Sequence, residues 1–187
     1  MKPSLKIFIV SILFATLAQA FEITDLQIAG SGCEVPVGGH ELIPILGSVN
    51  RFGIPLMMNL EKQASPALER KICTMSLAVK LNAGEKLQVQ DVSQKVSLLA
   101  GVGAKASTQL EVFMAGEVGA PLKAEITGVK KLVRRNQVLN DAGIVAESEC
   151  GHDTIVRANS SILLQGAARA RVKSDMLALT LRVVSCK

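Results

Sequence analysis

The residues best suited to chemistry lie in Cys150-Gly151-His152-Asp153, where a thiol, an imidazole and a carboxyl group fall within four positions. These groups support nucleophilic catalysis or metal binding when they converge in space. The members of a catalytic triad usually come from distant segments, so adjacency along the chain does not supply that geometry. A disulfide-bonded Cys150 would be neither a nucleophile nor a strong metal ligand. We therefore interpret the tetrapeptide as a disulfide followed by a turn.

Two further motifs invite a chemical interpretation. His40 stands beside Glu41 after two glycines, and Gly101-Val102-Gly103 with Lys105 faintly resembles a phosphate-binding loop. The second motif lacks the spacing and the Lys-Ser/Thr pair of such a loop, and no calcium-binding loop occurs in the sequence. A loop histidine and a tight turn explain both motifs. We predict no catalytic, cofactor-binding or metal-binding residue.

Three acidic residues cluster near the end of a predicted strand: Glu147, Glu149 and Asp153. A glycoside hydrolase needs two carboxyl groups roughly 5 to 9.5 Å apart in a cleft. A small secreted hydrolase that uses these carboxylates is therefore one alternative function. The other acidic residues are scattered, which favours a protein that is not an enzyme.

The cysteines Cys33, Cys73, Cys150 and Cys186 predict two disulfide bonds, because an even number of cysteines in an exported chain is typically oxidised. Pairing sequence neighbours, Cys33 with Cys73 and Cys150 with Cys186, closes loops of about 40 residues, each stabilising by roughly 4 kcal/mol. The nested alternative joins Cys33 to Cys186 and Cys73 to Cys150. We favour the first pairing and leave the nested one open.

The start of the chain has the pattern of a signal peptide, which implies export to the periplasm or beyond. Lys2 and Lys6 precede an apolar run at positions 7–17, and Ala18-Gln19-Ala20 fits the cleavage pattern. The run is too short for a membrane-spanning helix, which needs about 20 apolar residues, and no later segment reaches that length. We predict a signal peptide at 1–20, one domain at 21–187 and no transmembrane segment in the mature chain.

The basic residues indicate what kind of partner the chain suits. The formal net charge of +5 falls to +3 without the two lysines of the leader. Lys130, Lys131, Arg134 and Arg135 form a dense cluster, either a solvated rim or a surface that attracts an acidic polysaccharide or anionic lipid headgroups. Tryptophan and tyrosine are absent, so the base-stacking platforms of nucleic-acid-binding proteins are missing and no nucleic acid is expected.

A second basic group consists of Arg169, Arg171 and Lys173, separated by alanine and valine. Successive side chains of a strand point to opposite faces of the sheet. This spacing therefore directs all three cations to one side of a strand.

A segment at 47–60 is rich in large apolar residues, among them Ile54, Leu56, Met57 and Met58. As an exposed patch it would suit a carrier or inhibitor that binds a partner protein, because methionine-rich surfaces adapt to their partners. We favour burial of these residues in the core, since large exposed apolar patches are rare in soluble monomers.

Alternation of apolar and polar residues is the clearest structural signal, and it predicts strands. The alternating apolar residues are Cys73, Met75, Leu77, Val79 and Leu81 in the segment 72–81, and Leu177, Leu179, Leu181 and Val183 near the end of the chain. Cys186 falls out of phase with the second set. We therefore expect a β-bulge near Val184 and Ser185.

Further candidate strands, separated by glycines, lie at 86–92, 94–99, 108–114, 122–133, 144–149 and 161–165. This rhythm predicts an all-β chain, an antiparallel β-sandwich of about eight to ten strands stapled by disulfides. Helix is limited to a single turn at 65–71, with Pro66 near its start.

Several short segments recur in a recognisable order along the mature chain: Gly30-Ser31-Gly32-Cys33, Arg70-Lys71-Ile72-Cys73, Asn82-Ala83-Gly84, Ser148-Glu149-Cys150-Gly151 and a terminal strand that ends on Cys186. This order resembles the family called domain of unknown function 4360. The resemblance implies a small exported, disulfide-linked, β-rich domain with no established activity, and hence no catalytic residues to transfer. The chain departs from the family pattern in having Glu34 after the first cysteine, with proline delayed to Pro36, and in lacking the aromatic residues usual in the strands.

These observations favour an exported, non-enzymatic β-sandwich with a binding or structural role at the cell envelope. The partners that suit its charge are an acidic polysaccharide, an anionic lipid surface or another envelope protein. No cofactor is expected. The small secreted hydrolase and the protein-binding carrier or inhibitor are the alternatives.

Overall fold

The computed structural model describes residues 21–34, 39, 41–48, 50–64 and 67–186. The expected signal peptide, His40 and Pro66 lie outside these residues. The described part of the chain contains eleven strands and no helix. The strands are β1 (Glu22–Ala29), β2 (Ile43–Pro44), β3 (Arg51–Ile54), β4 (Met58–Lys62), β5 (Glu69–Lys80), β6 (Glu85–Ala100), β7 (Ala104–Met114), β8 (Leu122–Gly128), β9 (Val133–Glu147), β10 (Thr154–Gln165) and β11 (Ala170–Ser185).

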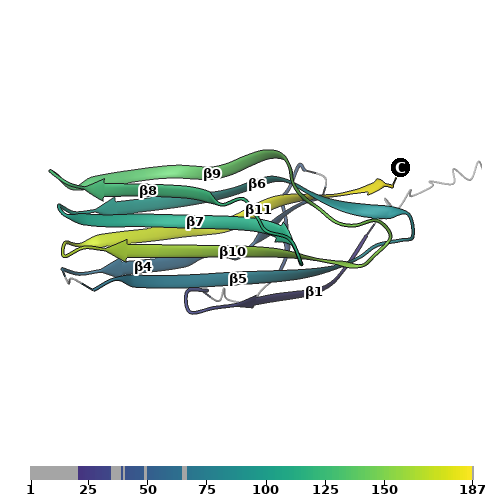
Figure 1. The fold of residues 1–187 in the computed structure, drawn as a ribbon, viewed down its shortest axis with the longest axis horizontal. Helices are drawn as coiled ribbons and strands as arrows, with labels where there is room; N and C mark the ends of the chain where they lie inside the picture. Colours follow the sequence, from purple (N-terminus) through teal and green to yellow (C-terminus); the bar gives the residue numbers. More distant parts are fainter. Residues whose placement is uncertain (1–20, 35–38, 40, 49, 65–66, 187) are drawn as a thin grey trace, which may run out of the picture.

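The strands form two antiparallel sheets that pack face to face (Figure 1). Sheet A has the order β1-β5-β10-β7-β8, and sheet B has the order β2-β3-β11-β6-β9, with β4 also paired to β11. The predicted all-β antiparallel sandwich is therefore confirmed. The strands outnumber the expected eight to ten because one side of sheet B is built from the short strands β2, β3 and β4, which no long alternating pattern marks.

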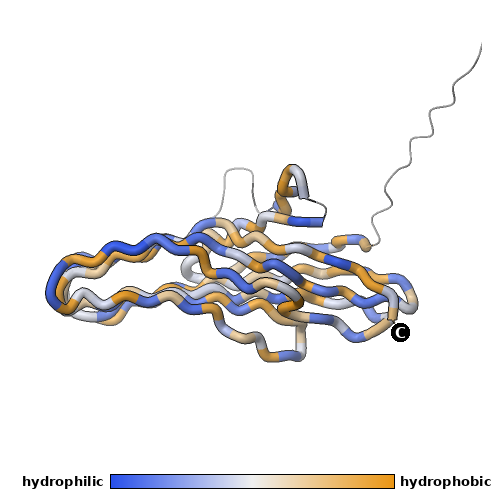
Figure 2. Tube along the Cα trace, turned by 90° about the horizontal axis from the view of Figure 1, so that it is seen from above, coloured by the Kyte–Doolittle hydropathy of each residue, from blue (hydrophilic) through white to orange (hydrophobic). Residues whose placement is uncertain are grey.

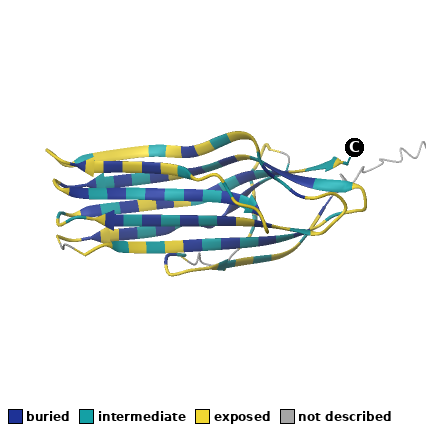
Figure 3. Ribbon diagram, in the orientation of Figure 1, coloured by how far each residue is buried: buried dark blue, intermediate teal, exposed yellow. Residues whose placement is uncertain are grey.

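The core lies between the sheets and is filled by the inward residues of the alternating strands (Figure 3). The buried residues of β5 are those that alternation predicts: Cys73, Met75, Leu77 and Val79. β11 buries Leu177, Leu179 and Leu181 in the same way. Phe21 and Phe52 pack edge to face with 6.4 Å between ring centroids, and aliphatic side chains and methionine supply most of the remaining core.

Several expectations about local structure are wrong. The helical turn expected at 65–71 is absent from its described part, because Glu69 to Lys71 already belong to β5 and pair with β10. The strand expected at 122–133 is two strands, β8 and β9, separated by a turn at 129–132. The separate strands expected at 86–92 and 94–99 are one strand, β6, in which register shifts around position 91 keep the apolar residues facing inward.

The bulge expected near Val184 and Ser185 is also wrong, since both residues pair with β6 without a register shift. The shifts in β11 lie instead within 174–180. Cys186 needs no bulge because its partner, Cys150, is exposed at the end of the sandwich and not buried in the core.

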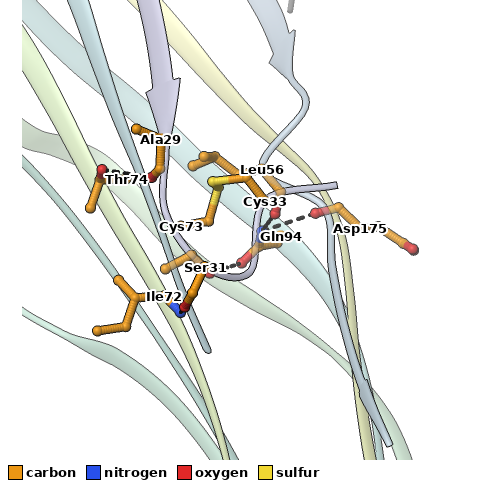
Figure 4. The surroundings of a disulfide bond; sticks show 10 residues. Ala29, Ser31, Cys33, Leu56, Ile72, Cys73, Thr74, Gln94 and Asp175 are labelled. Atoms are coloured by element: carbon orange, nitrogen blue, oxygen red, sulfur yellow. Dashed lines mark hydrogen bonds between the residues drawn. A yellow bond between two sulfur atoms is a disulfide. The ribbon is translucent and has the colours of Figure 1, made fainter. Parts of the chain in front are cut away.

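Two disulfide bonds join sequence neighbours, Cys33 to Cys73 and Cys150 to Cys186, with Cα–Cα distances of 4.9 and 6.0 Å. The first bond fastens the segment after β1 to β5, where Cys73 is fully buried (Figure 4). The second bond fastens the end of β11 to the connection between β9 and β10. Each bond thus secures a segment that lies beyond the end of a paired strand.

Near the first disulfide, a buried glutamine ties the two sheets together (Figure 4). Gln94 of β6 donates from Nε2 to the carbonyl oxygens of Leu56 and Asp175, at 3.2 and 2.9 Å. Its own Oε1 accepts a hydrogen bond from Ser160 Oγ of β10 at 3.4 Å. Leu56 lies between β3 and β4, and Asp175 lies at a register shift of β11. Gln94 therefore hydrogen-bonds carbonyl groups where the backbone ladder is interrupted.

Candidate functional site, a basic groove on sheet B

The outer face of sheet B brings together cations from strands far apart in the sequence. Arg171 of β11 pairs with Leu99 of β6, and Leu99 pairs in turn with Arg134 of β9. Directly paired residues share one face of a sheet, so the two arginines flank Leu99 on the side away from the core. Two strand spacings separate their Cα atoms by about 10 Å. The next outward row consists of Lys173, Ser97 and Asn136.

These rows form the walls and floor of a depression of about 390 Å³. Its lining residues are Ser97, Leu99, Leu132, Arg134, Asn136, Arg169, Arg171 and Lys173. A second depression, of about 470 Å³, continues from it and shares Ser97, Asn136 and Lys173. We call the two together the basic groove. Its lining residues come mainly from the neighbouring strands β11, β6 and β9, which are labelled in Figure 1.

Little negative charge opposes the cations of the first depression. Glu61 of β4 lies beside it and contacts two arginines, Arg169 Nη2 at 2.6 Å and Arg171 Nε at 3.7 Å. Arg171 Nε is itself buried and has no hydrogen-bond partner among the described residues. One carboxylate therefore serves two guanidinium groups, and Arg134 and Lys173 make no ion pair within the described part of the chain.

The floor of the groove also offers polar groups. Ser97 Oγ donates to Asn136 Oδ1 at 2.6 Å. The Asn136 carbonyl is thereby engaged, which leaves the amide NH₂ of that side chain as a donor at the groove. Cations that flank amide and hydroxyl groups suit a ligand that carries both negative charge and hydroxyl groups.

The structure divides the basic cluster expected from the sequence. Arg134 lines the groove, whereas Lys130 and Lys131 lie in the turn between β8 and β9. Arg135 pairs with Leu98, an inward residue, and so leaves β9 on the opposite side from Arg134. The alternating group at 169–173 lies on one side, as its spacing predicts, and that side is the outer face, where it supplies the groove's other cations. Sequence reasoning missed that the two basic groups meet, because only β6, lying between them, brings them together.

The sequence matches a family model described as domain of unknown function (DUF4360) over residues 19–184. The chain belongs to this family. The match spans nearly all of the described residues and confirms the resemblance carried by the cysteines and glycines. No curated protein matches this DUF4360 member.

Two solved structures similar to this DUF4360 chain were determined with bound sugars. One is TmCBM61 in complex with β-1,4-galactotriose, at 14% identity and a TM-score of 0.28, covering 88% of this chain and 90% of that one. The other is a family 11 carbohydrate-binding module from Clostridium thermocellum in complex with a mixed-linked tetrasaccharide, at 9% identity and a TM-score of 0.23, covering 75% and 95%. Neither superposition is close enough to transfer a site.

The carboxylates considered for hydrolysis do not form one group in this DUF4360 chain. Glu147 accepts hydrogen bonds from Lys86 Nζ and Gln88 Nε2, each at 2.6 Å. The Lys86 hydrogen bond, followed by the Gln88 hydrogen bond, lowers the pKa of the Glu147 carboxyl, which a general acid would need raised. Glu149 and Asp153 instead line a separate depression of about 240 Å³.

That separate depression, at the end of the sandwich, also includes His152. Cys150, which precedes His152 by two residues, offers no free thiol for catalysis or metal binding, because it is in a disulfide bond. Asp153 is engaged as well, since its Oδ1 accepts a hydrogen bond from the Leu81 amide at 3.1 Å. No group of histidine, cysteine and acidic side chains able to hold a metal ion occurs among the described residues.

Most of the large apolar residues that the structure describes in the segment 47–60 belong to the core. Ile54, Leu56 and Met58 are fully buried, and Met57 is half-buried. The favoured interpretation, burial in the core, is therefore confirmed for Ile54, Leu56 and Met58. These three residues form no exposed patch for a carrier or inhibitor to use.

Proposed function

We propose that this protein is a non-enzymatic binding module of the cell envelope and that it holds an acidic polysaccharide in the basic groove. The observation that carries the proposal is the convergence of Arg134, Arg171 and Lys173 around Leu99 and Ser97, with no carboxylate among the lining residues of the first depression. Carboxylate or sulfate groups on a polymer would supply the charge that the described residues leave uncompensated.

The groove suits a linear polymer better than a compact anion. Its two depressions are continuous along the sheet and combine cations with the Ser97 and Asn136 side chains, and the second depression also has one carboxylate, Asp175, in its lining. A chain of acidic sugars offers both repeated charges and repeated hydroxyl groups to such a surface.

The aromatic residues argue for an acidic sugar over a neutral one. Neutral sugars are commonly held by stacking on exposed aromatic rings, and the chain has no tryptophan or tyrosine. Phe21 and Phe52 are buried in the core, and Phe113 lies on sheet A. Recognition at the groove must therefore rest on charge and hydrogen bonds.

The envelope location in this proposal rests on the disulfides. Two disulfide bonds form readily outside the cytosol and are rare inside it. In addition, no helix in the described part of the chain has the length and apolar character needed to span a bilayer.

The test is affinity measurement against a polyuronate and against neutral dextran of similar length. We expect binding of the polyuronate alone, weakened about 10- to 100-fold by R134Q/R171Q/K173Q, since each exposed ionic contact is worth about 0.2–1 kcal/mol. The matched control is R70Q/K105Q/K123Q, which removes three cations that line a depression on sheet A.

Equal weakening by both triple variants would show that net charge and not the groove governs binding, and it would contradict the proposal. Absence of polyuronate binding by the unaltered protein would contradict it as well. Turnover of the polymer that is abolished by D153N or E149Q would instead support the hydrolase alternative, because both residues line the depression beside His152.

A further inference from the structure

One end of the sandwich gathers three connections that cross between the sheets, at 101–103, 129–132 and 166–169 (Figure 1). They join β6 to β7, β8 to β9 and β10 to β11, and each connection runs from one sheet to the other. The joined strands lie next to one another within each sheet, as β10-β7-β8 in sheet A and β11-β6-β9 in sheet B. We call these three connections, together with Leu68 just before β5, the turn end. The opposite end carries the Cys150–Cys186 disulfide and the connection between β7 and β8.

The connections of the turn end are held against one another. The Gly101 amide donates to the Arg169 carbonyl at 2.8 Å, and the Gly103 amide donates to the Gly128 carbonyl. A Cβ atom on Gly128 would lie 2.1 Å from the Gly101 carbonyl oxygen, so only glycine permits this approach. The turn end is therefore a fixed platform.

A buried lysine anchors the same platform from within. Lys62 is fully buried, and its Nζ donates to the carbonyl oxygens of Gly166, at 2.8 Å, and of Ala67. Burying an ammonium group is costly unless hydrogen bonds satisfy it. The bond to Gly166 joins the end of β4 to the connection between β10 and β11.

Large apolar side chains stand exposed on this platform. Their exposed fractions are 58% for Leu68, 56% for Val102, 66% for Val129 and 61% for Leu132. Turns usually carry glycine, proline, asparagine, aspartate or serine, each of which suits the backbone or the solvent. At the turn end, leucine and valine instead stand exposed at the tips of several connections.

Cations accompany the apolar tips, and acidic residues are absent from these connections. Lys130 and Lys131 are both exposed and lie between Val129 and Leu132 in the sequence. The connections at 101–103, 129–132 and 166–169 contain no aspartate or glutamate. Their third cation, Arg169, is paired with Glu61 of β4, so Lys130 and Lys131 supply the positive charge. Figure 2 shows hydrophobic and hydrophilic positions alternating around this end of the molecule.

We infer that the turn end docks on an anionic lipid surface. Apolar side chains flanked by lysines match the boundary between acyl chains and headgroups, where the apolar groups enter and the cations meet lipid phosphates. Val129 and Leu132 enter the interface, and Lys130 and Lys131 bind the headgroups. A second copy of the chain is a poorer occupant, because a symmetric contact would bring the same lysines together.

This docking goes beyond the proposed polysaccharide binding and does not depend on it. Leu132 lines the basic groove as well as the turn end, so the groove opens beside the lipid surface. A protein docked in this way would hold a polysaccharide along its flank, close to the membrane.

The first experiment measures co-sedimentation with vesicles of phosphatidylcholine containing about one third phosphatidylglycerol. We expect binding that salt weakens, a loss of about tenfold or more for V129S/L132S, and a loss of about 10- to 30-fold for K130Q/K131Q. The matched controls are L46S/V118S, which removes two apolar side chains that are each 97% exposed elsewhere, and K80Q/K123Q. Both controls should bind as the unaltered protein does.

A second experiment uses the absence of tryptophan from the chain. V129W and V118W each carry a single tryptophan, one at the turn end and one at the opposite end. We expect anionic vesicles to shift the emission of V129W to the blue and brominated lipids to quench it, while V118W changes little.

Three outcomes would overturn the inference. The first is the absence of binding to anionic vesicles. The second is vesicle binding that V129S/L132S does not weaken and that leaves the emission of V129W unchanged, since charge alone would then account for the binding. The third is a dimer of the unaltered protein that V129S/L132S converts to a monomer. Loss of vesicle binding is distinguishable from loss of polysaccharide binding, because R171Q/K173Q should affect only the latter.

Discussion

The outer faces of the two sheets carry depressions of similar size, but the charged residues that line the two depressions differ. On sheet A a depression of about 320 Å³ is lined by Arg70, Lys105, Lys123 and Glu125, and Lys105 pairs with Glu125 at 2.8 Å. On sheet B, the 390 Å³ part of the basic groove has four lining cations and no lining carboxylate. The number of cations is similar. The difference lies in the place of the carboxylate: Glu125 lines the depression on sheet A, whereas Glu61, which contacts Arg169 and Arg171, lies beside the basic groove. A lining of cations without a carboxylate, and not the count of basic residues, therefore sets sheet B apart.

The largest effect is expected from a substitution that gives the depression on sheet A a lining of cations without a carboxylate, as on sheet B. E125K removes the partner of Lys105 and places a further cation in the same depression. If the carboxylate in the lining is what distinguishes the faces, polyuronate affinity should rise about fivefold to tenfold, since each exposed ionic contact is worth up to about 1 kcal/mol. Affinity electrophoresis against polyuronate and neutral dextran would measure this. An unchanged affinity would mean that the shape of the groove, and not its charge, sets sheet B apart.

A smaller effect on polyuronate affinity is expected from a substitution beside the basic groove of sheet B. E61Q removes the carboxylate that contacts Arg169 and Arg171 beside the basic groove. Both guanidinium groups then become available, and we expect polyuronate to bind about threefold more tightly while the free energy of unfolding falls by less than about 1 kcal/mol. Titration calorimetry and urea denaturation provide the two readouts. Weaker binding by E61Q would indicate that Glu61 positions the arginines and does not compete for them.

The smallest effect concerns the far end of sheet B, where charge is paired as on sheet A. The pKa of Glu147 lies below its ordinary value of 4.5 because of hydrogen bonds from Lys86 and Gln88. The ionised carboxylate therefore stabilises the fold above that value, and the contribution is lost as the pH falls through the lowered pKa. The effect is small because the Glu147 side chain is 35% exposed.

Denaturant midpoints for E147Q should accordingly change less than those of the unaltered protein between pH 7 and pH 3. E149Q, which removes a nearby carboxylate outside this pair, is the control for the loss of one negative charge. Identical pH profiles for all three proteins would mean that the Lys86–Glu147 pair contributes nothing to stability. Charge pairing would then not distinguish the far end of sheet B from the groove.

Much of the fold was predictable because the information is local. Alternation in β5 and β11 identifies the residues that face the core, and each pattern can be read within one strand. The short strands β3 and β4 are not identified from the sequence: β3 is mostly buried and carries little alternation, and β4 alternates over only five residues, so their apolar residues also fit a surface patch. The bulge predicted near Val184 failed for a related reason, since it assumed that Cys186 must reach the core.

The candidate site was predictable only in part. The alternation at 169–173 indicates that three cations share a face. The density of the cluster at 130–135 suggested one surface, but the turn and the alternation of β9 divide its members between the turn end, the groove and the inner side of the edge strand. Nothing in either segment indicates that Arg134 lies two strands from Arg171.

The sequence by itself determined the all-β class, the faces of the long strands and the presence of cysteines suited to disulfide bonds. These follow from the two-residue period of a strand and from composition, which need no knowledge of neighbours. The tertiary structure alone decided which strands lie side by side, and in which register. A shift of one residue would turn every side chain of β9 to the other face. The groove and the turn end therefore exist only because β6 lies between β11 and β9, and because glycines let the connections pack closely.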